Sequence, residues 1–332
     1  MKLKSSTLAK IGAVVCALAL GATSACATSS TDGSGPVTLT VGHDQWIGYG
    51  GVFLAQDLGY FTEAGLDVQL KPFSNPGETL TAVAAGQLDI GLTTLQNLAV
   101  LGASGNTDAV AIALVDSSNG ADAIVAKNEI VSLNDLQGRT VGLTLGEVNH
   151  FLFLSAMSQA GVDPGTVNIV NMSADDAGAA FVAGKVDAAV TWEPWVTQAS
   201  QNGGRVLFSS ASIPDTILDS VVVQRSHLAD NAATYEKFLE AIDRGVGYLR
   251  SNPDEAATII GGYLDASATD VNGMLAGDTI YDLADNKRLF GTENAPGPAY
   301  RSMQSVVDFA VESKLIENAP PVESMFDPQL VR

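Results

Sequence analysis

The chain has 332 residues, of which 46% are hydrophobic and 16% are charged, so it is long enough for two globular domains with separate cores. Its 37 acidic and 17 basic side chains give a formal net charge of −20, which repels phosphate backbones and argues against a nucleic-acid partner. The two cysteines are too few for a cysteine zinc site, and the three histidines lack the spacing of metal ligands. We therefore expect no metal site.

The first 25 residues have the pattern of a secretory signal peptide. Three lysines precede the apolar run IGAVVCALALGA, and small residues follow it. The run ends in TSAC, which resembles the lipobox of bacterial lipoproteins and predicts Cys26 as the acylated first residue of the mature chain. Ordinary cleavage close to Cys26 is the alternative. We expect residues 26–36 to be a flexible tether, and the protein to be lipid-anchored on the outer face of the cell membrane, or else periplasmic.

The next part of the chain contains one segment twice. The sequence TVG begins at Thr40 and at Thr140, and similar Ala-Gly motifs recur about a hundred residues apart, at Ala64 and Ala160 and at Ala85 and Ala183. Their order is the same and their spacing is nearly constant. The pattern indicates a duplicated structural unit.

Each copy predicts the element order strand, helix, strand, helix, strand. The β-branched apolar runs at 37–42 and 140–145 are typical of buried strands, and the helical patterns after them end at Gly65 and Gly161. This alternation predicts an α/β fold with two lobes, each an open, mostly parallel sheet with flanking helices. We expect residues 37–118 and 224–332 in lobe 1, residues 119–223 in lobe 2, and a two-strand hinge near Ser117–Gly120. The strand at 217–223 is expected to pair with residues 122–126.

Ligands of open α/β sheets lie beyond the carboxyl ends of the strands, and the two copies differ at those ends. Tryptophans there can cover a flat ligand, carboxylates can accept hydrogen bonds from an amine, and hydroxyl or amide groups can hold polar ligand atoms. Bare backbone N–H groups beside glycines can form an anion pocket. The candidate ligand-binding residues are Trp46, Gly48, Tyr49, Thr93, Thr94, Ser118, Asn119, Gly120, Glu147, His150, Trp192, Glu193 and Asp219.

Each candidate also has a structural alternative. The glycines suit tight turns, the short hydroxyls suit helix caps, and Glu193 before Pro194 suits the start of a helix with Trp192 in the core. Asp219 fits a solvated loop as well as a cleft. No nucleophile elbow, HExxH motif, dinucleotide fingerprint or Walker motif occurs, so the sequence predicts neither an enzyme nor a cofactor.

Several segments together resemble the nitrate/sulfonate/taurine family of solute-binding proteins that serve ABC importers. They are WIGYGGVFLAQDLGYFTEAGLDV, AAGQLDIGL, DSSNGADAIVA, LNDLQGRTVG, AGKVDAAVTWEPW and ILDSVVV. The resemblance implies the type II periplasmic-binding-protein fold, a small-molecule ligand in the cleft, and a monomer that closes about its hinge and delivers the ligand to a permease. It places all the candidates except His150 at the cleft.

The charges of the candidates bear on the ligand. The strand-end loops contain no Arg or Lys, but they contain the acidic residues Glu147, Glu193 and Asp219. We therefore expect a ligand with both charge signs, such as a taurine-like amino-sulfonate. A pyrimidine or other heteroaromatic stacked on a tryptophan is the second possibility, and a small-molecule lyase or dehydratase on the same fold is the third.

Overall fold

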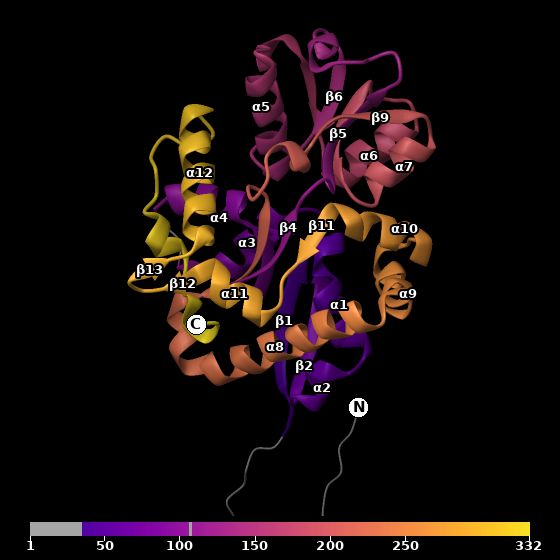
Figure 1. Ribbon diagram of the computed structural model, residues 1–332. Helices are drawn as coiled ribbons and strands as arrows, with labels where there is room; N and C mark the ends of the chain where they lie inside the picture. The colour runs from indigo at the N-terminus through magenta and orange to yellow at the C-terminus, as the bar shows by residue number, and fades with distance from the viewer. Residues whose placement is uncertain (1–34, 106–107) are drawn as a thin grey trace, which may run out of the picture. The chain divides into compact units, whose positions relative to one another are not determined.

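The computed structural model describes residues 35–105 and 108–332, and residues 36–332 form one compact unit. The expected signal peptide, Cys26 and nearly all of the expected tether lie outside the described residues. Two separate sheets with flanking helices organise this unit (Figure 1). We refer to each sheet with the helices packed on it as a lobe.

The first sheet has six strands in the order β11-β4-β10-β3-β1-β2. Strand β1 pairs in parallel with β2 and β3, whereas β10 and β11 pair antiparallel with their neighbours. The strands are β1 (Val37–His43), β2 (Leu66–Pro72), β3 (Ile90–Thr94), β4 (Ala109–Ser118), β10 (Leu218–Gln224) and β11 (Asp278–Ile280).

The second sheet has five strands in the order β7-β6-β8-β5-β9. Here β6 pairs in parallel with β7 and β8, and β5 pairs antiparallel with β8 and β9. The strands are β5 (Asp122–Lys127), β6 (Thr140–Leu143), β7 (Asn168–Asn171), β8 (Ala188–Trp192) and β9 (Gly204–Ser209), and a separate hairpin joins β12 (Gly291–Thr292) to β13 (Ala295–Pro296).

The predicted duplication is confirmed by the topology and by matching contacts. Strands β1, β2 and β3 have the same parallel arrangement as β6, β7 and β8. The Asp89 carboxylate accepts hydrogen bonds from the Thr40 backbone N–H and hydroxyl, both at 2.7 Å. The Asp187 carboxylate accepts one from the Thr140 N–H at 3.1 Å. The repeated Thr and Asp are therefore part of the scaffold that both copies share.

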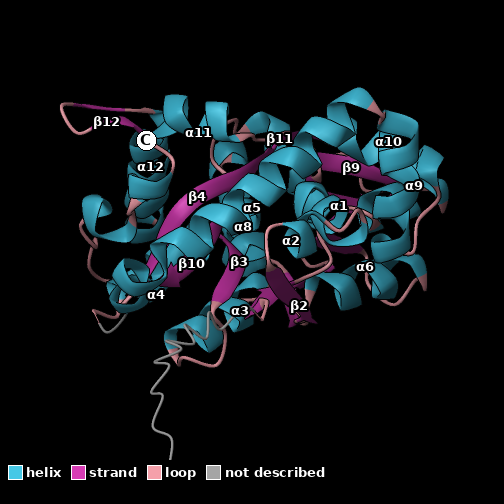
Figure 2. Ribbon diagram, turned by 90° about the horizontal axis from the view of Figure 1, so that it is seen from below, coloured by secondary structure: helices cyan, strands magenta, loops and turns pink. Residues whose placement is uncertain are grey.

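Helices cover both sheets (Figures 1 and 2). In the first lobe α1 and α2 pack against the long helix α8, α3 packs on β3, and α12 packs on α4; in the second lobe α6 packs on β6 and β8. Glycines allow close packing, because a Cβ at Gly42 or Gly142 would crowd side chains of α3 or α6. The helices are α1 (Gly50–Asp57), α2 (Tyr60–Glu63), α3 (Pro76–Ala84), α4 (Leu95–Ala103), α5 (Val148–Ala160), α6 (Ala174–Val182), α7 (Trp195–Gln201), α8 (Arg225–Ser251), α9 (Pro253–Leu264), α10 (Ala268–Met274), α11 (Leu283–Phe290) and α12 (Pro298–Glu312).

Two segments carry the chain between the sheets. Residues 119–121 join β4 to β5, and residues 210–217 join β9 to β10. The expected pairing of the strand at 217–223 with residues 122–126 is wrong, because β10 pairs with β3 and β4 in the first sheet. The antiparallel strands β5, β9, β10 and β11 also make both sheets mixed rather than mostly parallel.

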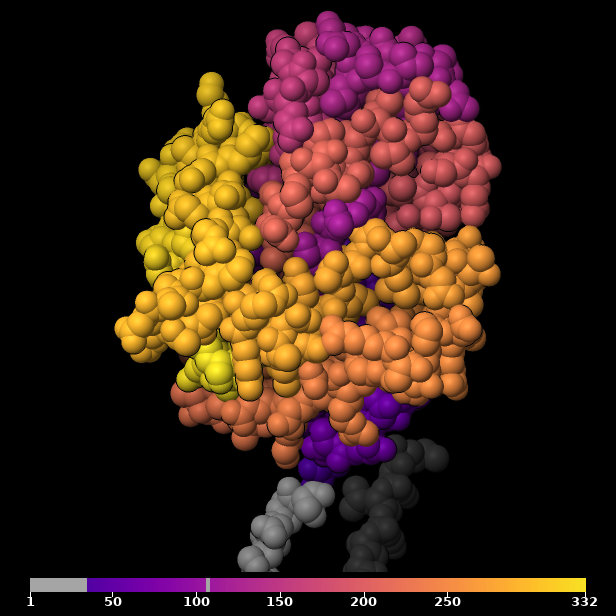
Figure 3. All heavy atoms as spheres, in the orientation of Figure 1, coloured from indigo at the N-terminus to yellow at the C-terminus, as the bar shows by residue number. Residues whose placement is uncertain are grey.

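In the space-filling view (Figure 3), segments of the first lobe lie against segments of the second lobe. Orange segments, which belong to the C-terminal third, border the magenta and salmon segments of the second lobe (Figure 3). Within residues 35–105 and 108–332, no helix has both the length and the apolar composition needed to cross a membrane.

Candidate functional site

A small cavity lies where strand ends from both sheets meet. It leaves about 10 Å³ for the centre of a water-sized sphere, which is roughly the space of one water molecule, and is lined by Asp44, Trp46, Pro76, Thr94, Asp122, Val148, Trp192, Ile217 and Asp219. Strands β1, β3 and β8 contribute their carboxyl ends or the residues just after them, while β5 and β10 contribute their first residues. The cavity therefore lies at the edge at which open α/β sheets bind ligands.

The register of the strands brings the polar residues together. Asp219 of β10 is opposite Thr94 of β3 on one side and Asp116 of β4 on the other. Across the second sheet, Asp122 of β5 is opposite Trp192 of β8. Each of these side chains is at most 4% exposed. Pairing between residues far apart in the sequence thus concentrates carboxylates in a buried place.

Two aromatic side chains donate to this aspartate cluster, which consists of Asp44, Asp116, Asp122, Asp219 and Asp278. The Trp46 indole N–H donates to Asp116 Oδ2 at 2.7 Å, and the Tyr49 hydroxyl donates to Asp219 Oδ1 at 2.7 Å. Gly48 permits the first contact, since a Cβ at this position would overlap the Asp116 carboxylate.

Several carboxylate oxygens of the cluster have no hydrogen-bond partner within the part of the chain that the structure describes. They are Asp44 Oδ1, Asp116 Oδ1 and Asp122 Oδ2. None of the described residues that line the cavity is basic. Buried polar atoms without partners are rare in folded proteins, so these oxygens are expected to bind a water molecule, an ion or a ligand.

Burial controls the ionisation of the cluster. It raises the pKa of Asp44 to about 7, and the charges of Asp175 and Glu147 add to this effect. Burial and the charge of Glu193 raise the pKa of Asp122 to about 7 as well. The pKa values of Asp116, Asp219 and Asp278 lie well above the usual range, because burial and mutual repulsion both disfavour the charged forms.

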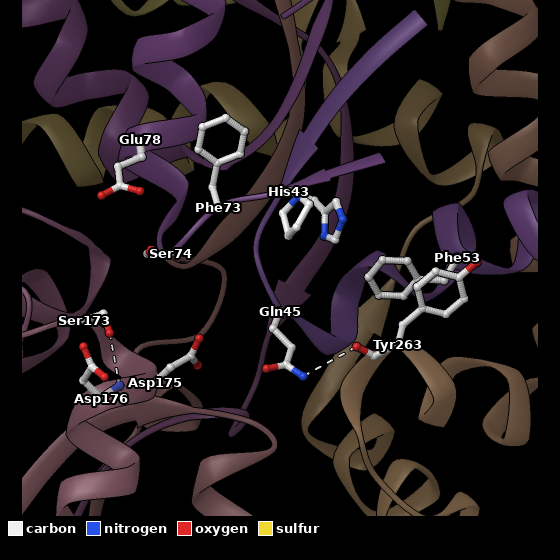
Figure 4. A pocket seen from close by; sticks show the side chains of 11 residues that line it. His43, Gln45, Phe53, Phe73, Ser74, Glu78, Ser173, Asp175, Asp176 and Tyr263 are labelled. Atoms are coloured by element: carbon white, nitrogen blue, oxygen red, sulfur yellow. Dashed lines mark hydrogen bonds between the residues drawn. The ribbon is translucent and has the colours of Figure 1, made fainter. Parts of the chain in front are cut away.

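A larger open cleft is lined by His43 and Gln45, the sequence neighbours of Asp44, among other residues (Figure 4). In Figure 4, Ser173, Asp175 and Asp176 lie at the start of α6, and the stacked rings of Phe53 and Tyr263 lie apart from them on the first lobe. Those two ring centroids are 4.5 Å apart. The cleft is lined by His43, Gln45, Phe53, Pro72, Phe73, Ser74, Glu78, Ser173, Asp175, Asp176 and Tyr263.

Of the sequence candidates, Trp46, Thr94, Trp192 and Asp219 line the buried cavity, with Gly48 and Tyr49 directly behind it. The hydroxyl of Thr94 also caps α4, where it accepts a hydrogen bond from the backbone N–H of the third helical residue.

Other candidates make contacts elsewhere. The Thr93 hydroxyl donates to the Pro76 carbonyl at 2.9 Å, and its counterpart Thr191 makes the same contact with Ala174 at 2.8 Å. Because both copies of the duplicated unit share this bond, it belongs to the scaffold.

The hinge candidates join the two crossing segments to each other. The hydroxyl oxygens of Ser118 and Ser210 are 2.8 Å apart, and the Gly120 N–H donates to the Ser210 hydroxyl at 2.6 Å. Asn119 is exposed, and its backbone N–H donates to the Gly277 carbonyl at 2.8 Å. Bonds of Ser118 and Gly120 to Ser210 therefore connect the two segments that cross between the sheets.

Glu147, His150 and Glu193 have local roles. The Asn97 side-chain amide donates to the Glu147 carboxylate, which links α4 of the first lobe to the start of α5 in the second. His150 accepts from the Gly146 N–H at 3.2 Å, and burial lowers its pKa. The Glu193 carboxylate accepts from the N–H and hydroxyl of Thr197, at 2.9 and 3.0 Å, and so stabilises the first turn of α7.

Sequence reasoning missed Asp44, Asp116 and Asp122, which lie at the centre of the cluster. A signal for one of them is present, because Asp116 directly follows the apolar run AVAIALV within the same fully buried strand. A charged residue at the end of such a run indicates a buried charge with a specific partner or function.

Comparison with known proteins identifies the family. Residues 46–256 match the model of the family described as NMT1/THI5 like. The chain belongs to the NMT1/THI5-like family. Two sequence relatives are the taurine-binding periplasmic protein of Escherichia coli and the formylaminopyrimidine-binding protein of Halalkalibacterium halodurans. The first is 29% identical over 196 residues, or 58% of this chain and 60% of that protein. The second is 26% identical over 215 residues, or 63% of this chain and 64% of that protein.

Solved structures confirm the fold predicted for this NMT1/THI5-like chain. The periplasmic aliphatic sulphonate binding protein SsuA of Escherichia coli aligns with a TM-score of 0.71 at 22% identity, covering 89% of this chain and 99% of that protein. At this level of identity the match establishes the periplasmic-binding-protein fold and leaves the ligand open.

Proposed function

We propose that this protein is the solute-binding component of an ABC importer, and that it binds a small organic molecule between its two lobes for delivery to a permease. The observation that carries the proposal is the buried cavity, to which Trp46 and Asp219 of the first lobe and Trp192 and Asp122 of the second contribute. A ligand in contact with both walls stabilises the closed arrangement of the lobes, as in hinge-closing binding proteins. The names of the relatives in the family support the same function.

The proposal includes closure of the lobes about the two crossing segments. Contacts between the lobes support it: the Asn97 amide binds Glu147, and the rings of Phe151 and Phe309 meet edge to face with centroids 4.8 Å apart. The Gln201 amide also donates to Asp270 at 3.1 Å. Two of these three contacts are side-chain hydrogen bonds, and a ligand that binds the closed arrangement more tightly shifts the balance between open and closed lobes.

Export and anchoring complete the proposal. We place the protein outside the cytoplasm as a monomer, attached to the membrane through acylated Cys26. Mass spectrometry of the mature N-terminal peptide tests the anchor: an acylated peptide beginning at Cys26 supports it, and an unmodified N-terminus at another residue contradicts it.

The central experiment identifies the ligand. The protein is purified from cells without refolding and then denatured, and the released small molecules are analysed by mass spectrometry. A released compound should raise the Tm of the refolded protein and be recovered unchanged after incubation. Conversion to a product would instead favour the lyase or dehydratase alternative, and failure of any compound to bind would contradict the proposed function.

A further inference from the structure

We infer that the ligand is a small organic cation, such as a protonated amine, an amidine or a positively charged heteroaromatic ring, held by Asp44, Asp122 and Asp219 between Trp46 and Trp192. This inference rests on the proposed function and specifies the chemistry of its binding site. It departs from the expectation of a taurine-like zwitterion, in which the sulfonate would need a positively charged or donor-rich partner.

The charges around the cavity have one sign. The aspartates that line it are surrounded by further carboxylates: the charges that raise the pKa of Asp44 are those of Asp175 and Glu147, and for Asp122 the charge is that of Glu193. For Asp219 they are the charges of Asp116, Asp44 and Asp122. Among the described residues, the lining contains no Lys, Arg or His. An anion placed here would lose its hydration without gaining a counter-charge.

Unpaired oxygens on both sides of the cavity supply an independent indication of a bound donor. Asp44 Oδ1 comes from the first lobe and Asp122 Oδ2 from the second, and both side chains are 3% exposed. Each lacks a hydrogen-bond partner within residues 35–105 and 108–332. A cation with N–H groups would donate to both oxygens and neutralise the repulsion between the lobes. Closure and cation binding therefore support each other.

Aromatic walls suit the same class of ligand. Trp46 is oriented by the bond from its indole N–H to Asp116, and Trp192 lines the cavity from the end of β8. Indole faces attract organic cations through their quadrupole, most strongly when the cation is desolvated. A metal ion fits less well, because no group of three or more His, Cys, Asp or Glu among the described residues has the geometry to hold one.

The test uses ligands matched in size and different in charge. Ethylammonium, taurine and ethanesulfonate share a two-carbon chain, and benzylammonium and phenylmethanesulfonate share an aromatic ring. Binding to the mature protein at pH 8 is measured by calorimetry and by the shift in Tm, with calcium and magnesium chloride as further probes. We expect each ammonium compound to bind at least about tenfold more tightly than its sulfonate partner. Taurine or a sulfonate binding as tightly as the ammonium compound, or a divalent metal ion binding at the site, would overturn the inference.

Proton release gives a second readout. Because Asp44 and Asp122 must ionise to hold a cation, binding at pH 6.5 should release protons, which calorimetry in buffers of different ionisation enthalpy measures. Binding of an anion would instead take up protons or leave their number unchanged. Uptake would contradict a cationic ligand even if the affinities were similar.

Charge-neutral variants locate the site. Asp44→Asn and Asp122→Asn should each weaken cation binding at least about tenfold and keep or raise the Tm of the free protein, because a buried charge is removed. Asp230→Asn, at an exposed position of α8, is the matched control and should bind normally. Normal cation binding by both cluster variants would overturn the inference.

The outcomes also separate this inference from the proposed function. A copurified neutral or anionic molecule whose binding is weakened in Trp192→Ala would leave a solute-binding protein with a different ligand. If none of the probes binds, the charge of the copurified molecule decides the inference. A cationic molecule supports it, and a neutral or anionic molecule overturns it. If no small molecule copurifies or binds, both proposals fail.

Discussion

The buried aspartates should make the ligand-free protein less stable as the pH rises. Asp122 is the most direct position to test. Its pKa is raised from 3.8 to about 7 in the folded protein, so folding favours the protonated form. The stabilisation is therefore fully present below about pH 4 and is lost as the pH rises through 7. Asp44 contributes with the same sign over the same range.

The size of the effect follows from the shift. One pKa unit corresponds to about 1.4 kcal/mol, so the shift of Asp122 amounts to about 4 kcal/mol between pH 4 and pH 8. About 1 kcal/mol changes the Tm of a domain of this size class by roughly 2–4 °C. About 3 kcal/mol of the effect falls between pH 5 and pH 8, so the Tm should fall by roughly 6–12 °C over that range. Carboxylates whose pKa values are lowered, such as Asp187 beside Lys127, act in the opposite direction. A comparison with a variant removes their contribution.

The assay measures Tm from pH 5 to pH 8 for the ligand-free wild type, for Asp122→Asn and for the exposed control Asp230→Asn. The wild type and the control should share one profile, and Asp122→Asn should lose less stability as the pH rises. A bound cation should restore the wild-type Tm at pH 8. Parallel profiles for Asp122→Asn and the wild type would refute the reasoning, because they would mean that Asp122 is solvated or already paired.

Further substitutions test individual contacts. Gly48→Ala should destabilise the protein by about 1–3 kcal/mol and weaken ligand binding, because its Cβ overlaps the Asp116 carboxylate; Gly247→Ala, with open space around the Cβ, should keep or raise the Tm. Trp192→Ala should weaken binding by about 1–3 kcal/mol in calorimetry if the ring contacts ligand, and unchanged affinity would assign it to the core alone. Glu147→Ala removes a bond between the lobes and should lower affinity severalfold while increasing the radius of gyration of the free protein in X-ray scattering; an unchanged radius and affinity would exclude a role in closure.

The scaffold could be predicted from the sequence because its signals are local and occur twice. Apolar β-branched runs, glycines at helix ends and the constant spacing of the repeat together predict the parallel units of both sheets. The bonds of Asp89 and Asp187 to Thr40 and Thr140 explain why those residues recur. The rule that ligands bind beyond strand ends then led to Trp46 and Trp192, which line the cavity.

The charge of the site was decided only by tertiary structure. The pairing of β10 with β3 and β4, rather than with the second sheet, buries Asp219 beside Asp116. The direction of the Glu193 side chain commits its carboxylate to α7, although Glu193 directly follows Trp192, which lines the cavity. Neither outcome has a local signal, because strand partners and side-chain directions depend on packing between distant segments. Carboxylates that would be ordinary surface groups on separate strands become a buried cluster only when the two sheets bring them together.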